Sequence, residues 1–182
     1  MQRRIQRVVD VFTKVTLHGS TLAMIGLFLI VFINSVRRYT IGKSLEWGEE
    51  LPIYITIFGV MFGTAMAYIQ DRHIRFTILV GFLSEKWTRL LYIFVDLIMI
   101  INGVLLTYSG WMFAAKRGGV ESSGIINLAK TLRSLTGWEG IIWLGYQYPY
   151  QLAMVLGGVL LIIAAALKLI LRISETSSPT PT

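Results

Sequence analysis

The chain has 182 residues, of which 54% are hydrophobic and 15% are charged, and it carries a net charge of +7 with no cysteine. Soluble domains average about 45–50% apolar and about 25% charged residues, and the apolar residues here come in long runs, so most soluble enzymes, disordered chains and β-barrel porins are excluded. Without cysteine, disulfides, iron–sulfur clusters and thiolate metal sites are excluded too.

Four apolar runs are long enough to cross a bilayer, which needs about 20 helical residues. They cover about residues 15–36, 51–69, 90–111 and 150–171. The sequence therefore predicts an all-α integral membrane protein, with residues 1–173 forming one four-helix transmembrane domain. The basic start is interpreted as part of a retained first span, because the run is too long for a signal peptide.

The connection after the first span predicts a charge clamp. Two basic residues end that span and three acidic residues follow, namely Arg37, Arg38, Glu46, Glu49 and Glu50. The connection is short, so the first two spans are predicted to be antiparallel neighbours whose charges meet. The alternative is solvated loop charge, worth about 0–1 kcal/mol per pair.

The start of the second span is predicted to be helical and bent. Ser44 is the expected N-cap, and Pro52 is expected to kink the helix because it cannot donate to the Gly48 carbonyl.

Small residues mark faces for close helix approach in the second and third spans. The second span carries Gly59, Gly63 and Ala67 at four-residue spacing. The third span carries Asp96, the only acid well inside a span, on a face with mostly small or polar residues: Ile100, Gly103, Thr107, Gly110 and Ala114.

Two interpretations of the third-span face stay open. Asp96 pairs with a basic residue or a hydroxyl inside the bundle, or the face docks to a separate membrane protein. We expect the second span to close the bundle and the third span to meet the partner.

The connection at 116–148 is predicted to be an outer interfacial segment. The spacing of its apolar residues predicts an amphipathic helix over 125–135, lying in the membrane interface. An aromatic cluster at head-group depth follows, consisting of Trp138, Trp143, Tyr146, Tyr148 and Tyr150. The mostly apolar connection 74–86 is expected along the inner surface, and the tail 174–182 is expected to be disordered.

Basic residues predict the orientation. Ten Lys and Arg lie on the side of both termini and the second connection, against seven on the other side. The richer side is expected to be cytoplasmic, so both termini are predicted inside. The basic flanks favour anionic lipid head groups as partners, not nucleic acid.

No catalytic motif is present, so neither an enzyme nor a resident cofactor is predicted. The alternative function from another class is a haem-bearing membrane anchor of a respiratory enzyme, with His18 and His73 as candidate ligands at similar depths. The simpler interpretation is that each histidine is an ordinary polar residue near the membrane surface. The third hypothesis for the function is a small transporter that works without other subunits.

An ordered set of motifs resembles a known family. It consists of Arg37, Trp47-Gly48-Glu49-Glu50-Leu51, Phe62-Gly63-Thr64-Ala65-Met66-Ala67 and Arg72-His73-Ile74-Arg75. This set is similar to the small membrane subunit (DctQ-like) of tripartite ATP-independent periplasmic (TRAP) transporters. The resemblance covers residues 37 to about 83 well, with Trp47, Glu50 and His73 as the motif residues. Thr77 stands where the family often has Asp.

The resemblance implies a sodium-coupled transporter for organic acids in a bacterial or archaeal cytoplasmic membrane. A large membrane subunit would carry the substrate and sodium sites and move as an elevator, and a periplasmic binding protein would deliver the acid. The small subunit would be a fixed, non-catalytic scaffold. The sparse intramembrane chemistry agrees with this expectation.

Overall fold

A computed structural model of the chain describes residues 2–70 and 84–176. Its long helices are α1 (Gln2–Ile41), α2 (Glu50–Ile69), α4 (Glu85–Arg117) and α6 (Tyr148–Thr176). A shorter helix, α5 (Ser123–Thr136), and two 3-10 helices, η1 (Glu46–Gly48) and η2 (Glu139–Gly145), lie in the connections. The described residues form no strand, and the four long helices are apolar enough to cross a membrane, which confirms the predicted fold class.

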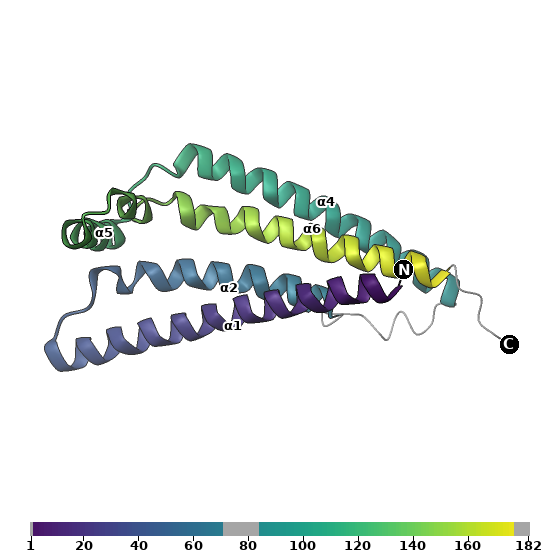
Figure 1. The fold of residues 1–182 in the computed structure, drawn as a ribbon, viewed down its shortest axis with the longest axis horizontal. Helices are drawn as coiled ribbons and strands as arrows, with labels where there is room; N and C mark the ends of the chain where they lie inside the picture. Colours follow the sequence, from purple (N-terminus) through teal and green to yellow (C-terminus); the bar gives the residue numbers. More distant parts are fainter. Residues whose placement is uncertain (1, 71–83, 177–182) are drawn as a thin grey trace.

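The helices form a row, with α2 and α6 in the middle and α1 and α4 at the edges. Helix α4 packs chiefly on α6, α6 packs on α2, and α2 packs on α1. Figure 1 shows the α4–α6 pair beside the α1–α2 pair. We call the end of the molecule that holds the start of α1 and the finish of α6 the terminal end, and the end that holds η1, α5 and η2 the loop end.

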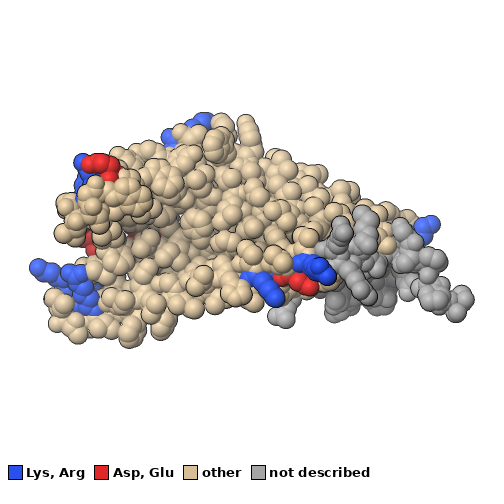
Figure 2. Space-filling view, viewed as in Figure 1, with Lys and Arg blue, Asp and Glu red and all other residues tan. Residues whose placement is uncertain are grey.

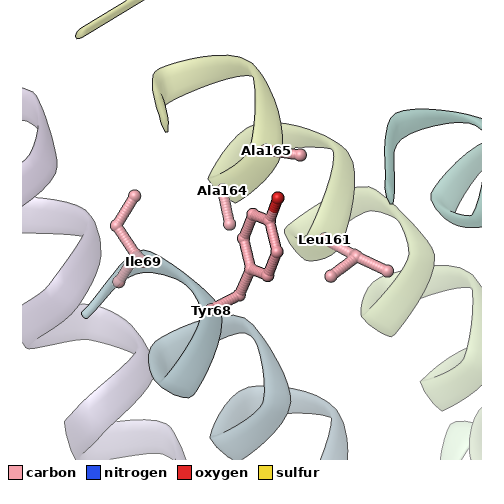
Figure 3. Packing of buried hydrophobic residues seen from close by; sticks show 5 residues of the cluster. All are labelled: Tyr68, Ile69, Leu161, Ala164 and Ala165. Carbon is pink, nitrogen blue, oxygen red and sulfur yellow. The ribbon is translucent and has the colours of Figure 1, made fainter. Parts of the chain in front are cut away.

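One cluster of buried apolar side chains lies toward the terminal end. It consists of side chains from α2 and α6, namely Tyr68, Ile69, Leu161, Ala164 and Ala165 (Figure 3). Apolar side chains of α1 and α4, including Phe12 and Ile100, pack against it. The small alanines let the helices approach closely, so this cluster joins all four long helices.

The helices extend beyond the predicted spans. Helix α1 has 40 residues, which corresponds to a length of about 60 Å, twice the thickness of a bilayer core. Charged residues fill the extensions, for example Arg7 and Arg38 on α1. In Figure 2 most of this face carries no charged side chain, and the charged side chains that it shows gather in a few separate groups.

The start of the second span differs from its prediction. Leu45, not Ser44, precedes η1, and α2 then begins at Glu50 with Glu49 at its N-cap position. Pro52 therefore lies in the first turn of α2, where a missing N–H leaves no intrahelical bond unmade. The predicted kink across Gly48 and Pro52 is wrong, because the helix starts between these two residues.

The predicted amphipathic helix over 125–135 is present as α5. It ends at Gly137, whose φ of 70° is the left-handed conformation that glycine adopts without strain. Two backbone bonds, from Ser122 N to Gly145 O at 2.9 Å and from Gln147 N to Val120 O at 2.9 Å, tie the two sides of the 118–148 connection together. The connection is thus a folded unit over the loop end.

Two expectations fall mainly outside the described residues. They are the inner-surface placement of the connection 74–86 and the disorder of the tail 174–182. At their described margins, α4 begins at Glu85 and α6 continues to Thr176.

Candidate functional site

A buried carboxylate joins three helices at the terminal end. Asp96 of α4 is fully buried. Tyr68 of α2 donates its hydroxyl to Asp96 Oδ1 at 2.5 Å, and Nε of Arg172 on α6 lies 2.9 Å from Asp96 Oδ2. We call Tyr68, Asp96 and Arg172 the polar cluster. Because charges attract strongly in a medium of low dielectric constant, the cluster fixes the three helices relative to one another.

Further contacts hold the arginine in place. The Arg172 guanidinium lies over the Tyr92 ring, 4.4 Å from its centroid, which is a cation–π geometry. Arg89 Nη2 donates to the Arg172 carbonyl oxygen at 2.6 Å. Both contacts run between α4 and α6, so they strengthen the same helix pair that the ion pair joins.

The polar cluster decides between the two interpretations of Asp96. The carboxylate pairs with a basic residue inside the bundle and has no exposed surface through which to dock a partner. Sequence reasoning did not name Tyr68, and it counted Arg172 only among the basic residues on the side of the termini. A signal was present in the sequence, because Tyr68 and Arg172 fall at the ends of their apolar runs and Asp96 lies near the start of the third run.

The small residues of the second span lie against α1. A Cβ on Gly59 would be 2.8 Å from Met24 Cε and 3.1 Å from Ala23 Cβ, and one on Gly63 would be 3.4 Å from Ser20 Oγ. Ser20 donates to the Gly59 carbonyl at 3.3 Å. This face therefore holds α2 to α1, while Ala67, further along α2, is half-buried.

The small residues of the third span lie against α6, which corrects the expectation that they meet a partner. A Cβ on Gly103 would be 2.6 Å from Ile162 Cγ1 and 2.9 Å from the Gly158 carbonyl. One on Gly110 would be 2.9 Å from Met154 Cβ. Thr107 contacts α6 at Gly158, and Ala114 is 1% exposed. The reason is that α6 brings its own Gly158 to this face, so the two helices meet closely.

Two carboxylates of the first connection bind α5. Glu50 accepts hydrogen bonds from the Ser123 hydroxyl at 2.8 Å and from Gly124 N at 3.2 Å. Glu46 accepts one from Asn127 Nδ2 at 2.8 Å. A carboxylate is stabilised at a helix N-terminus, where backbone N–H groups lack partners. We call these five residues the loop-end cap.

The predicted pairs of the charge clamp are not formed. Ion pairs within the described ranges join Lys130 to Glu121, Arg133 to Glu139 and Arg172 to Asp96, and none joins Arg37 or Arg38 to the three acids. The cause is the path of the connection: Leu45 N donates to Asn34 Oδ1 at 2.7 Å, so the chain folds back along α1. Glu46 and Glu50 then face α5, and Glu49 is exposed.

The remaining motif residues are placed as follows. Trp47 lies half-buried in η1, and Gly124 approaches its backbone so closely that a Cβ there would be 3.0 Å from Trp47 Cα. His73 lies outside the described residues. His18 Nδ1 is bonded to the Lys14 carbonyl at 2.6 Å. No group of three or more potential metal ligands occurs where the structure describes the chain.

The fold and these contacts define a multi-pass helical membrane protein whose intramembrane polar groups hold its own helices together. Comparison with known proteins gives the family. Residues 27–175 match the family described as tripartite ATP-independent periplasmic transporters, DctQ component, and the chain belongs to this family. It is accordingly a TRAP transporter small permease subunit and not an enzyme.

Two relatives, both from Haemophilus influenzae (strain ATCC 51907 / DSM 11121 / KW20 / Rd), carry the name of TRAP transporter small permease proteins. One is 28% identical over 84 residues, which is 46% of this chain and 52% of the relative. The other is 24% identical over 89 residues, which is 49% of this chain and 54% of the relative. The matched part of the chain thus spans about half the length of these relatives.

Proposed function

We propose that this subunit is the fixed scaffold of a sodium-coupled TRAP transporter for organic acids. In this proposal a large membrane subunit carries the substrate and the sodium ions and moves as an elevator, and a periplasmic binding protein delivers the acid. The chain itself binds neither substrate nor cofactor. Its membership in the family supports the transporter; the polar contacts support the scaffold role.

The observation that carries the scaffold role is the use of the buried polar side chains. Asp96 and Arg172 pair with each other, Thr16 donates to the Phe12 carbonyl at 2.9 Å, and Ser122 bonds Tyr54 at 3.2 Å. A transport path needs several polar groups that face a common passage. Here the pairs Asp96–Arg172 and Ser122–Tyr54 instead join separate parts of the subunit, and Thr16 bonds within its own helix.

The exposed faces fit the same role. The edge helices α1 and α4 carry most of the large exposed apolar side chains, including Phe28 at 65% and Ile101 at 58% exposure. A rigid row of helices with apolar outer faces widens the stationary part of a membrane complex, because neighbouring helices and lipid both pack on such faces.

Uptake by reconstituted liposomes tests the proposal. Liposomes receive the small subunit alone, the large subunit alone or both, with the binding protein, a panel of radiolabelled organic acids and an inward sodium gradient. Uptake of an acid is expected only with both membrane subunits, the binding protein and the gradient. Uptake by the small subunit alone, or equal uptake by the large subunit without it, would overturn the scaffold role.

The haem-anchor alternative is not favoured, because the family to which the chain belongs is a transporter subunit family. We further propose that the subunit lies in the cytoplasmic membrane of a bacterium or archaeon with both termini in the cytoplasm. The ten-to-seven distribution of basic residues supports this orientation.

A further inference from the structure

One polar side chain faces outward at the middle of an edge helix. Asn102 of α4 is exposed, thirteen residues from Arg89 and fourteen from Lys116. At 1.5 Å per residue it lies about 20 Å from either basic residue, near the centre of the apolar part of the helix. No other Asn or Gln in the membrane-spanning helices, as far as they are described, is exposed at this depth.

The carboxamide of Asn102 is only partly satisfied by its own helix. Nδ2 donates to the Ile98 carbonyl at 2.9 Å, while Oδ1 has no hydrogen-bond partner among the described residues. Lipid tails offer neither donors nor acceptors, so an amide oxygen left in hydrocarbon is costly. A neighbouring helix that carries a donor removes this cost, and Asn is one of the residues that join membrane helices in this way.

The residues around Asn102 form a continuous face. We call it the Asn102 face; its members are spaced three or four apart on α4, namely Val95, Ile98, Asn102, Leu105 and Ser109. The three apolar members are 38–57% exposed, and Ser109, two turns from Asn102, is a second exposed polar residue. This face is separate from the face of α4 that carries Gly103, Thr107 and Gly110, which we call the Gly103 face and which α6 already covers.

Charge indicates which helix covers the face. Lys116 lies fourteen residues from Asn102, nearly four turns, so it continues the Asn102 face at the loop end. It takes part in no ion pair within the described ranges. In a symmetric parallel dimer of this chain two Lys116 side chains would meet, and like charges oppose such contact. A helix of a different protein has no such restriction.

We infer that the Asn102 face is the surface on which a transmembrane helix of the large subunit packs, with a hydrogen bond to the Asn102 carboxamide at mid-membrane. The inference rests on the proposed function, because that function supplies the large subunit. It replaces the Gly103 face as the contact surface.

Co-purification of the small subunit with its large subunit in mild detergent tests the inference. Asn102→Leu keeps the number and branching of the side-chain heavy atoms and removes the hydrogen bond, so association is expected to weaken about 3- to 20-fold. Ile98→Trp places a bulky ring on the Asn102 face and is expected to block association. The matched control is Leu97→Trp, because Leu97 and Ile98 are 46% and 39% exposed but point about 100° apart.

The outcomes separate the inference from the proposed function. If the unaltered subunit fails to co-purify with the large subunit, the proposed function fails. If it co-purifies and both Asn102→Leu and Ile98→Trp co-purify as well as Leu97→Trp, the inference alone is overturned. Folding of each variant is checked by its gel-filtration profile without the large subunit.

Cross-linking identifies the occupant. The chain has no cysteine, so Ser109→Cys introduces a unique thiol on the Asn102 face. Oxidation or a short bifunctional reagent, applied to the complex with cysteines placed along the large subunit, is expected to give a product of both chains. A product containing two small subunits, at about twice the 20.5 kDa of one chain, would assign the face to a second copy and overturn the inference.

Discussion

At the scale of single residues, the strongest feature is an ion pair between Asp96 and Arg172 whose further contacts all lie within the subunit. Asp96 has one partner on α2 and one on α6, and its own helix supplies the ring that covers Arg172. An unpaired charge inside a membrane protein costs far more than a paired one. The terminal end of the subunit therefore depends on keeping both charges or neither.

Removing one charge of this pair is expected to destabilise the subunit strongly. Asp96→Leu leaves Arg172, whose side chain is only 18% exposed, without its carboxylate, for which a loss of about 3–5 kcal/mol is typical. The measurement is the thermal melting of the detergent-solubilised subunit, followed by gel filtration. Asp96→Leu and Arg172→Leu should each melt well below the unaltered subunit, and the double variant should recover much of the loss. A double variant that melts as low as the sum of the singles would contradict the pairing.

The sequence predicted the importance of Asp96 but not the identity of its partners. A lone acid inside an apolar run is visible by eye, whereas Arg172 was counted only as a basic residue near the membrane surface. Its long side chain reaches back into the bundle, which spacing within one helix does not reveal. The same limit explains the clamp: proximity in sequence placed the three acids with the two arginines, but α5, more than 70 residues away, supplied the partners of Glu46 and Glu50.

The loop-end cap gives a prediction with a matched control. Glu50→Ala removes the acceptor of Ser123 and Gly124 at the start of α5, whereas Glu49→Ala removes an exposed acid of the same type. Losing a cap typically costs about 0.5–2 kcal/mol. Hydrogen–deuterium exchange at the first turn of α5 should become faster in Glu50→Ala and stay unchanged in Glu49→Ala and in Arg37→Gln. Faster exchange in Arg37→Gln would contradict this prediction and support the charge clamp predicted from the sequence.

At the scale of helices, the two faces of small residues both hold the subunit together. Their spacing predicted close approach correctly, but it contained no information about which helix approaches. The deciding residues lie on α6, where Gly158 allows α4 to come close and Gly157 lies against Met61 of α2. A face of small residues on one helix therefore shows that another helix packs there, but the partner helix is identified only by the residues on its own facing side.

Alanine substitution along these faces ranks the helix contacts. Gly103→Ala would place a Cβ against the α6 backbone and is expected to cost about 1–3 kcal/mol through overpacking. Gly63→Ala meets only Ser20 Oγ at 3.4 Å, and Gly26→Ala meets nothing within 4 Å. The melting temperature should fall clearly for Gly103→Ala and change little for the other two. Equal melting temperatures in all three would mean that α4 and α6 are not so closely packed.

At the scale of the whole molecule, the row of helices leaves two edges. A closed bundle would bury each helix on two sides, but α4 packs chiefly on α6 and presents the rest of its surface outward. The sequence predicted the four helices and the extra helix at the loop end, because apolar runs and amphipathic spacing are local signals. The order of the helices in the row depends on contacts between distant segments, so it became visible only in three dimensions.

The orientation of this row in the membrane is the last prediction. The start of α1 and the finish of α6 lie at one end and α5 lies at the other, so one reagent distinguishes the two possible orientations. Because the terminal end has the larger share of Lys and Arg, we expect it in the cytoplasm. Single cysteines at Ser134 on α5 and at Ser178 in the tail are tested with a membrane-impermeant maleimide. In intact spheroplasts Ser134→Cys should react and Ser178→Cys should react only after lysis. The cysteine-free parent chain is the control for background labelling, and the reverse pattern would place the loop end in the cytoplasm and exclude the proposed orientation.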